Sequence, residues 1–221
     1  MFAVILGAAA VRNESAGGLD AEIAPSDIPA YHFSGDPEKS RTRGLAPLLE
    51  DPSLRSSVVL YLEEEVGNPN VAKALVEAAE RYGLDPALIV SLARQESGFR
   101  PRAKGVNTNG TVDRGLMQLN SSSFAFLTER EFYDPFLNAD YGAAYLKHTI
   151  ELSGNVVAGL AMYNAGPGRV GSLGAPRSTL DYISNIIGYQ NELVRGYYDR
   201  YQSDTELLVR DFRPVKNPDL L

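Results

Sequence analysis

Apolar residues recur at helical spacing through the middle of the chain. In the segment 68–83, Val71, Leu75 and Ala79 fall on one face of a helix, and Gly83 follows where that helix would end. The neighbouring segments carry helical signals of the same kind: 51–68, 84–97, 134–154, 155–166 and 179–202. The pattern predicts an all-α domain, with one irregular stretch between residues 98 and 133.

Three of these segments begin with an Asp-Pro pair. An aspartate at the N-cap position accepts hydrogen bonds from the first free amides, and proline fits the first helical position. The pairs stand at residues 51–52, 85–86 and 134–135. In the first segment the run Val-Val-Leu-Tyr would suit a strand, but the Asp-Pro start and the three glutamates that follow favour a helix.

The irregular stretch contains turn residues rather than helical periodicity. The sequence GVNTNGTVDRG (105–115) is rich in glycine and asparagine and predicts a loop with a short β-hairpin. We expect a short helix over 121–129, capped by the serines at its start. The glycine-rich segment 166–178 is expected to be a loop.

These elements suggest five parts of the chain. Residues 1–20 resemble the later part of a secretory signal or a frayed apolar terminus, and 21–45 read as a linker or arm. Residues 46–68 form a helical extension, 69–202 the main domain, and 203–221 a tail. The apolar run near the start is too short to span a bilayer, and no other segment is a candidate membrane span.

Composition narrows the classes of function. The 221 residues carry a net charge of −7, which argues against nucleic acid as the main partner. There is no cysteine, so neither disulfides nor thiolate metal sites can form, and His32 and His148 lie far apart in sequence. We expect no metal and no cofactor.

One acidic residue, Glu96, lies in line with apolar residues. Leu88, Leu92 and Glu96 are spaced four apart, so Glu96 continues the buried face of the helix 84–97 at its C-terminal end. Burial and the helix dipole both disfavour the carboxylate and favour a protonated acid. A glutamic acid that stays protonated near neutral pH can act as a general acid. The alternative is an ion pair with Arg94, Arg100 or Arg102.

Five short motifs accompany this glutamate, in a fixed order. They are ARQESGF (93–99), GLMQLN (115–120), NADYGAAYL (138–146), AMYNAGPGRV (161–170) and DYISNIIGY (181–189). Together they resemble the soluble lytic transglycosylase (SLT-type) family over about residues 69–195. The resemblance implies a lysozyme-like helical fold and a carbon–oxygen lyase that cleaves peptidoglycan glycan strands.

The resemblance also assigns roles to residues. Glu96 would be the sole essential acid and base, first protonating the oxygen between N-acetylmuramic acid and N-acetylglucosamine. It would then accept the proton of the muramoyl C6 hydroxyl, which closes a 1,6-anhydro ring without water. The residues expected to bind substrate are Ser97, Met117, Gln118, Asn120, Tyr163, Asn164 and Tyr182. Asn138 is expected to be a helix cap and Gly142 a point of close packing.

Some of these residues also have a plain structural interpretation. The Ser97 hydroxyl could bond its own helix backbone, and Tyr163 and Tyr182 could be packing aromatics. Residues 94–114 hold five basic residues against two acidic ones, which would suit the anionic peptide stems of the substrate or would simply be a solvated loop.

Asp113 raises a different mechanism. The segment 107–120 is longer than is usual in the family, and it places Asp113 in a pattern similar to the second carboxylate of C-type lysozymes. Asp113 could therefore be a second catalytic carboxylate of a hydrolase, or only a turn residue. A glycan-binding module without activity is a third alternative. Both enzyme hypotheses, transglycosylase and hydrolase, imply that the protein is exported to the periplasm or cell envelope.

Overall fold

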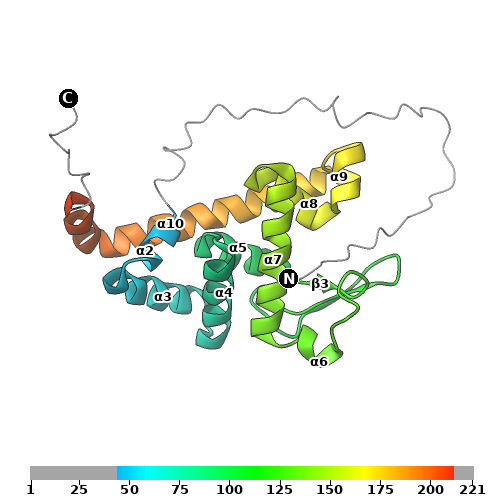
Figure 1. Cartoon of the computed structure of the whole chain (residues 1–221), viewed down its shortest axis with the longest axis horizontal. Coiled ribbons are helices and arrows are strands. Elements are labelled where there is room, and N and C mark those ends of the chain that lie inside the picture. Colours follow the sequence, from blue (N-terminus) through cyan, green and yellow to red (C-terminus); the bar gives the residue numbers. More distant parts are fainter. Residues whose placement is uncertain (1–43, 212–221) are drawn as a thin grey trace, which may run out of the picture.

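The computed structural model describes residues 44–211, except for the side chains of residues 53 and 202–211. The signal-like segment 1–20, nearly all of the arm 21–45 and the end of the tail after residue 211 lie outside these residues. The helical part begins with α2 (Ala46–Leu49), α3 (Pro52–Val66), α4 (Pro69–Tyr82) and α5 (Pro86–Ser97). Then come β1 (Lys104–Val106), β2 (Val112–Arg114), β3 (Leu119–Asn120), α6 (Glu129–Phe132), α7 (Pro135–Ser153), α8 (Val156–Ala165), α9 (Pro167–Leu173) and α10 (Arg177–Asp211). The prediction of a mainly helical domain with a small β element is confirmed (Figure 1).

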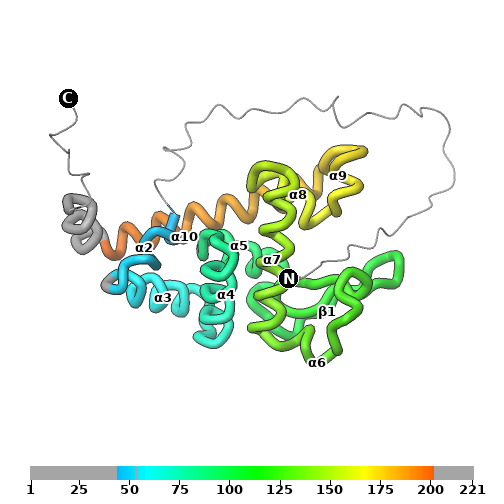
Figure 2. Tube along the Cα trace, viewed as in Figure 1, coloured from blue at the N-terminus to red at the C-terminus, as the bar shows by residue number. Residues whose placement is uncertain are grey.

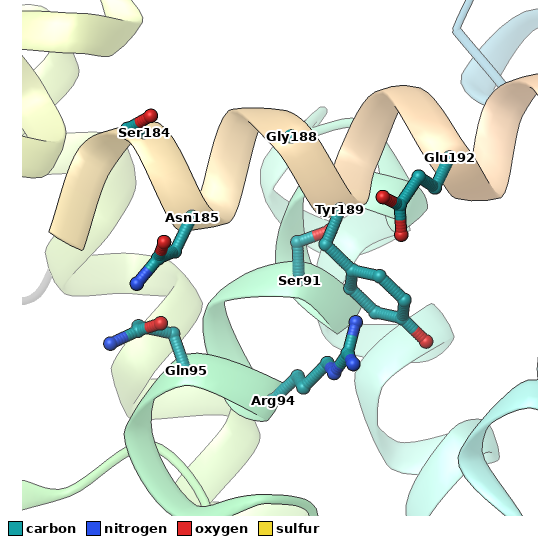
Figure 3. Close-up of a pocket in the computed structure, with 8 residues that line it drawn as sticks. All are labelled: Ser91, Arg94, Gln95, Ser184, Asn185, Gly188, Tyr189 and Glu192. Atoms are coloured by element: carbon teal, nitrogen blue, oxygen red, sulfur yellow. The ribbon is translucent and has the colours of Figure 1, made fainter. Parts of the chain in front are cut away.

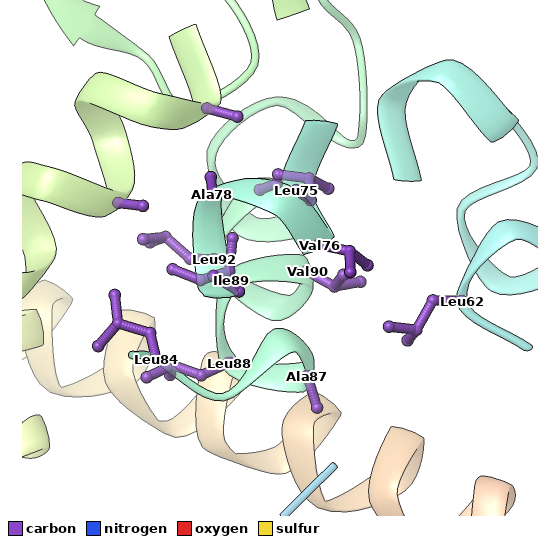
Figure 4. Packing of buried hydrophobic residues seen from close by; sticks show 14 of the residues in the cluster. Leu62, Leu75, Val76, Ala78, Leu84, Ala87, Leu88, Ile89, Val90 and Leu92 are labelled. Carbon is purple, nitrogen blue, oxygen red and sulfur yellow. The ribbon is translucent and has the colours of Figure 1, made fainter. Parts of the chain in front are cut away.

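Helix α5 lies at the centre of the domain. Helix α4 packs against one side of it and α10 against another, so its residues from Pro86 to Ala93 are all buried. Figure 4 shows Ile89 and Leu92 of α5 among Leu75 and Ala78 of α4. Burying a leucine or isoleucine contributes roughly 1.5–3 kcal/mol, so this packing holds α5 in its position in the core.

Asp85 ties the start of α5 to the N-terminal extension. One oxygen of its carboxylate accepts from the Ala87 amide (2.8 Å), as the N-cap prediction requires. The other oxygen accepts from the Leu45 amide at the same distance. The chain around α2 also lies beside α10 (Figure 2). There the Tyr198 hydroxyl donates to the carbonyl of Gly44, just before α2. The extension therefore shares the core of the main domain.

The three strands form an antiparallel sheet in the order β1-β2-β3, beside the start of α7. Gly105 pairs with Asp113, and Asp113 pairs with Asn120. The predicted hairpin is present, and β3 extends it. The predicted helix over 121–129 is wrong, because the chain makes turns there. The helix begins after Thr128, which forms a capping box with Glu131.

Two further predictions need correction. The segment 167–173 is not a loop but a short helix, α9, whose first residue is proline. The last helix does not stop at residue 202, since helical structure continues to Asp211. A non-helical residue, Tyr201, interrupts α10 close to the predicted end.

Asn138 holds the sheet region against α7. Its side chain is fully buried, accepts from the Met117 amide (2.7 Å) and donates to the carbonyls of Arg114 (3.0 Å) and Phe132 (2.9 Å). It is therefore not a helix cap as predicted, because Asp134 caps α7. Gly142 is the point of close packing that was expected: a Cβ there would lie 2.6 Å from that of Met117.

Replacing Asn138 should destabilise the fold strongly. Asn138→Ala leaves one amide and two carbonyl groups without their partner, and we expect the free energy of unfolding to fall by about 3 kcal/mol. Urea denaturation measures this difference. Asn191→Ala, at an exposed position of α10, is the control and should change stability by less than about 0.5 kcal/mol. Equal effects of the two substitutions would contradict the role given to Asn138.

Candidate active site

Glu96 stands in the last turn of α5. The helix ends because Gly98 adopts a left-handed conformation (φ 59°) and its amide bonds back to the Arg94 carbonyl (2.9 Å). Part of the Glu96 side chain is accessible, while its carboxyl group faces α10. The hydroxyl of Tyr182, a buried residue of α10, donates to Glu96 Oε1 at 2.5 Å. Two residues 86 positions apart in sequence thus meet at one hydrogen bond.

The surroundings of Glu96 favour its protonated form. Burial raises the pKa of Glu96 from 4.5 to about 7, the hydrogen bond from Tyr182 lowers it, and the charge of Asp113 raises it. Both protonation states are therefore accessible near neutral pH, as an acid that later acts as a base requires.

The arginines near Glu96 in sequence do not form an ion pair with its carboxyl group. Among the described residues, Glu96 forms no ion pair. The Arg94 guanidinium lies 3.7 Å from the centre of the Tyr189 ring, and Arg100 Nε donates to the Ser97 carbonyl (2.7 Å). The alternative of an arginine ion pair is thus excluded by the structure.

Asp113 is the other carboxylate close enough to influence Glu96. It lies in the central strand β2, and two amide side chains hold it in place. Asn107 Nδ2 donates to Asp113 Oδ2 (2.9 Å), and Asn120 Nδ2 donates to Asp113 Oδ1 (2.7 Å). Asp113 is therefore fixed by its neighbours, and its charge acts on Glu96 through the interior.

Tyr163, from α8, lies on a third side of the site. Its hydroxyl donates to the Met117 carbonyl (2.9 Å), and its ring lies 5.2 Å from that of Tyr145. Burial, together with the charge of Glu96, raises the pKa of Tyr163 well above its usual value. Tyr163 thus stays a neutral hydrogen-bond donor, and the same holds for Tyr182.

Three of the residues expected to bind substrate, Ser97, Met117 and Asn120, are buried or already hydrogen-bonded within the protein. The Ser97 hydroxyl is buried and donates to the Ala93 carbonyl, and the Met117 side chain is fully buried against Gly142. Asn120 is occupied by Asp113 and Thr111. Neither Ser97 nor Met117 presents its side chain to solvent here, as a sugar contact would require.

Gln118 and Asn164 remain accessible. Gln118 donates to the Gly115 carbonyl (2.8 Å) from a backbone with positive φ (49°), a strained conformation that favours glycine. Asn164 is exposed, and its Oδ1 accepts from the Thr179 hydroxyl (2.7 Å). Both keep hydrogen-bonding capacity for a ligand.

Tyr145, from the motif at 138–146, packs against Tyr163. One positioning residue was not predicted from the sequence: Asn107, which supports Asp113. Asn107 lies six residues before Asp113 in the same turn-rich stretch. This closeness in sequence is the feature from which their contact could have been predicted.

Within residues 44–211 no group of three or more His, Asp or Glu side chains is arranged to hold a metal ion. In the same range, none of the helices combines the length and the hydropathy that crossing a membrane would need. Fold and site together define a helical enzyme domain with one protonatable carboxyl group at its centre.

Comparison with known proteins identifies the family. The model of the family "Transglycosylase SLT domain" matches residues 73–185, more than half of the chain, and the chain belongs to this family. Membership confirms the resemblance seen in the motifs and agrees with the lysozyme-like fold that it implied.

Individual relatives are similar over parts of their length. The protein IpgF of Shigella flexneri is 33% identical over 96 residues, which cover 41% of this chain and 63% of IpgF. The soluble lytic murein transglycosylase of Escherichia coli is 28% identical over 130 residues, 51% of this chain and 20% of that enzyme. A solved structure of an inactive mutant of the Pseudomonas aeruginosa lytic transglycosylase Slt matches 59% of this chain and 24% of its own, with 27% identity and a TM-score of 0.45. The chain thus spans less than two thirds of the length of these relatives.

The raised pKa of Glu96 should appear as a pH-dependent stability. The folded protein keeps a proton on Glu96 that the unfolded chain has already released, so the free energy of unfolding falls as pH rises from about 4.5 to about 7. We expect Glu96→Gln to be more stable than the wild type by on the order of 2 kcal/mol above pH 7, and this advantage to shrink toward pH 4.

Urea denaturation of both proteins across this pH range measures the difference. Glu50→Gln, which removes an exposed carboxylate at the end of α2, controls for the loss of one negative charge. A stability difference that does not change with pH would show that Glu96 is not held protonated.

Proposed function

We propose that the protein is a peptidoglycan lytic transglycosylase that cleaves the β-1,4 bond between N-acetylmuramic acid and N-acetylglucosamine without water. The observation that carries this proposal is the buried carboxyl group of Glu96, held by Tyr182, with a pKa of about 7. Membership of the SLT family supports the reaction class. The relative from Escherichia coli is itself named a murein transglycosylase.

The proposed reaction uses Glu96 twice. Protonated Glu96 donates its proton to the glycosidic oxygen, the bond from that oxygen to the muramoyl anomeric carbon breaks, and the substrate's own acetamido group meets the developing positive charge. Glu96, now ionised, accepts the proton of the muramoyl C6 hydroxyl, whose oxygen bonds to the anomeric carbon. The product is a 1,6-anhydro sugar and Glu96 is protonated again, so one carboxyl group suffices.

Tyr182 and Tyr163 would support this cycle from two sides. The Tyr182 hydroxyl stabilises the ionised form of Glu96 between the two steps, since its hydrogen bond lowers the pKa of Glu96. Tyr163 is neutral and buried close to the same carboxyl group, where it orients the site. Gln118 and Asn164 are the accessible amides that we assign to hydroxyl and acetamido groups of the sugars.

The proposed substrate places the protein outside the cytoplasm, in the periplasm or cell envelope, where peptidoglycan lies. Peptidoglycan strands are the proposed partner. Three exposed basic residues, Arg100, Arg102 and Lys104, follow Glu96 closely in the sequence and would suit an anionic polymer.

Hydrolysis is the second candidate, because a specific carboxylate favours it. Asp113 is fixed by Asn107 and Asn120, and its charge reaches Glu96. In a retaining hydrolase such a carboxylate stabilises or attacks the anomeric carbon, and water then releases the sugar. We favour transglycosylation, in which Asp113 only keeps the pKa of Glu96 high.

The products distinguish the two reactions. Digestion of purified sacculi should release fragments with 1,6-anhydro-muramoyl ends, which mass spectrometry identifies by the missing water. Glu96→Gln should lower the rate about a thousandfold, since general acid catalysis typically contributes a hundredfold to ten-thousandfold. Reducing muramic ends would indicate hydrolysis, and full activity of Glu96→Gln would contradict the role of Glu96.

Asp113→Asn tests the role of the second carboxylate. If Asp113 acts only through its charge, the pKa of Glu96 falls, so the loss of activity at alkaline pH should begin at a lower pH while anhydro products persist. If Asp113 is part of a hydrolase, the rate should fall about a thousandfold or more at every pH. Thermal denaturation checks that the substitution leaves the strand region folded.

A further inference from the structure

A polar groove runs between α5 and α10, near the Glu96–Tyr182 hydrogen bond. It has a volume of about 460 Å³. Figure 3 shows Arg94 and Gln95 of α5 on one wall and Asn185, Tyr189 and Glu192 of α10 on the other. None of these residues takes part in the proposed proton transfers.

The side chains of the groove offer unused hydrogen-bonding groups. In the described part of the chain, the side chains of Gln95, Asn185 and Glu192 make no hydrogen bond and no ion pair. Gln95 and Asn185 point toward each other across the groove in Figure 3. Each amide can donate and accept, as pairing with the amide bonds of a peptide requires.

The groove also carries two opposite charges. The Arg94 guanidinium is held against the Tyr189 ring rather than by a carboxylate, so its hydrogen-bond donors remain available for a ligand carboxylate. Glu192, one helical turn after Tyr189, is free to accept from an ammonium group. Arg94 covers one face of the Tyr189 ring, so that face is not free to stack on a sugar.

The position of the groove relates it to the cleavage site. Gln95 is adjacent to Glu96, and Asn185 lies one turn after Tyr182, about 4.5 Å along the helix axis. From Asn185 to Glu192 the groove extends about 10 Å along α10, the length of about three residues in an extended peptide.

We propose that this groove binds the peptide stem of the glycan strand, with Arg94 on a stem carboxylate, Glu192 on the free amine and the two amides on the peptide backbone. A stem of about three residues has the required length and both charges. This inference rests on the proposed function for its substrate, but the binding itself does not need catalysis.

Gly188 allows the groove to be blocked without disturbing the core. It lies in α10 at the groove, and a Cβ added there meets no heavy atom within 4 Å. A glutamine at this position fits a helix well and would occupy the space that the peptide needs. Arg195→Gln, an exposed change further along the same helix, is the matched surface control.

The test measures, by calorimetry, binding of the tripeptide N-acetyl-L-alanyl-γ-D-glutamyl-diaminopimelate to the full chain carrying Glu96→Gln. The acetyl group blocks the alanine nitrogen, as its link to the glycan does in the strand, so that the amine of diaminopimelate is the free amine of the peptide. We expect Gly188→Gln and Arg94→Gln each to weaken binding about tenfold or more, and Arg195→Gln to leave it unchanged. Acetylating the free amine of the peptide should weaken binding to this protein but not to its Glu192→Gln variant, because only the former has a charge to lose.

Each outcome decides between interpretations. Absence of peptide binding, or equal binding to the Gly188→Gln variant, overturns the inference. Displacement of the peptide by stem-free glycan chains would also overturn it, since the groove would then bind sugars. If the peptide binds as expected but the wild type releases no fragments from sacculi, the proposed function fails and the peptide site stands.

Discussion

A carboxyl group that has to stay protonated near neutral pH must be shielded from water, and this requirement explains much of the architecture. Helix α5 is packed by α4 and α10 for most of its length, so that its last turn places Glu96 inside the domain. Within residues 44–211, the hydrogen bond that the carboxyl group accepts comes from a neutral phenol rather than a cation, so it supports ionisation without forcing it. A buried arginine in place of Tyr182 would hold Glu96 ionised, and the proposed reaction would lose the proton that it donates first.

The strand region holds Asp113, the carboxylate whose charge raises the pKa of Glu96, in a fixed position. It is short, and polar side chains connect its parts. Asn107 and Asn120 bond to Asp113, and Asn138 bonds to three backbone groups. Buried polar groups with all partners in place rigidify a structure, whereas missing partners are costly. The charge of Asp113 can therefore act on Glu96 from a fixed position.

Local signals predicted the helices but not the direction of every side chain. The caps Asp85 and Asp134 and the stop at Gly83 were readable, because each bonds to neighbours in sequence. The helix expected at 121–129 failed because Asn120 and Ser121 are committed to the sheet, while Thr128 with Glu131 carried the true start signal. Helix α9, with two glycines among its seven residues, forms against α8, and no local propensity predicts it.

Glu96 and Tyr182 could be linked in advance only through the family resemblance, since 86 residues separate them and their contact depends on how α5 crosses α10. Met117 and Ser97 are buried for local reasons instead: Met117 packs on Gly142 of α7, and the Ser97 hydroxyl bonds to the Ala93 carbonyl of its own helix. The crossing of α5 and α10 also creates the groove that holds Arg94 and Asn185, two residues that carry no shared sequence signal. Helices α5 and α10 form both the Glu96–Tyr182 hydrogen bond and the groove. A peptide bound in the groove would therefore contact the two helices that bring Glu96 and Tyr182 together. Stem binding and the protonation of Glu96 would then be linked through the same packing.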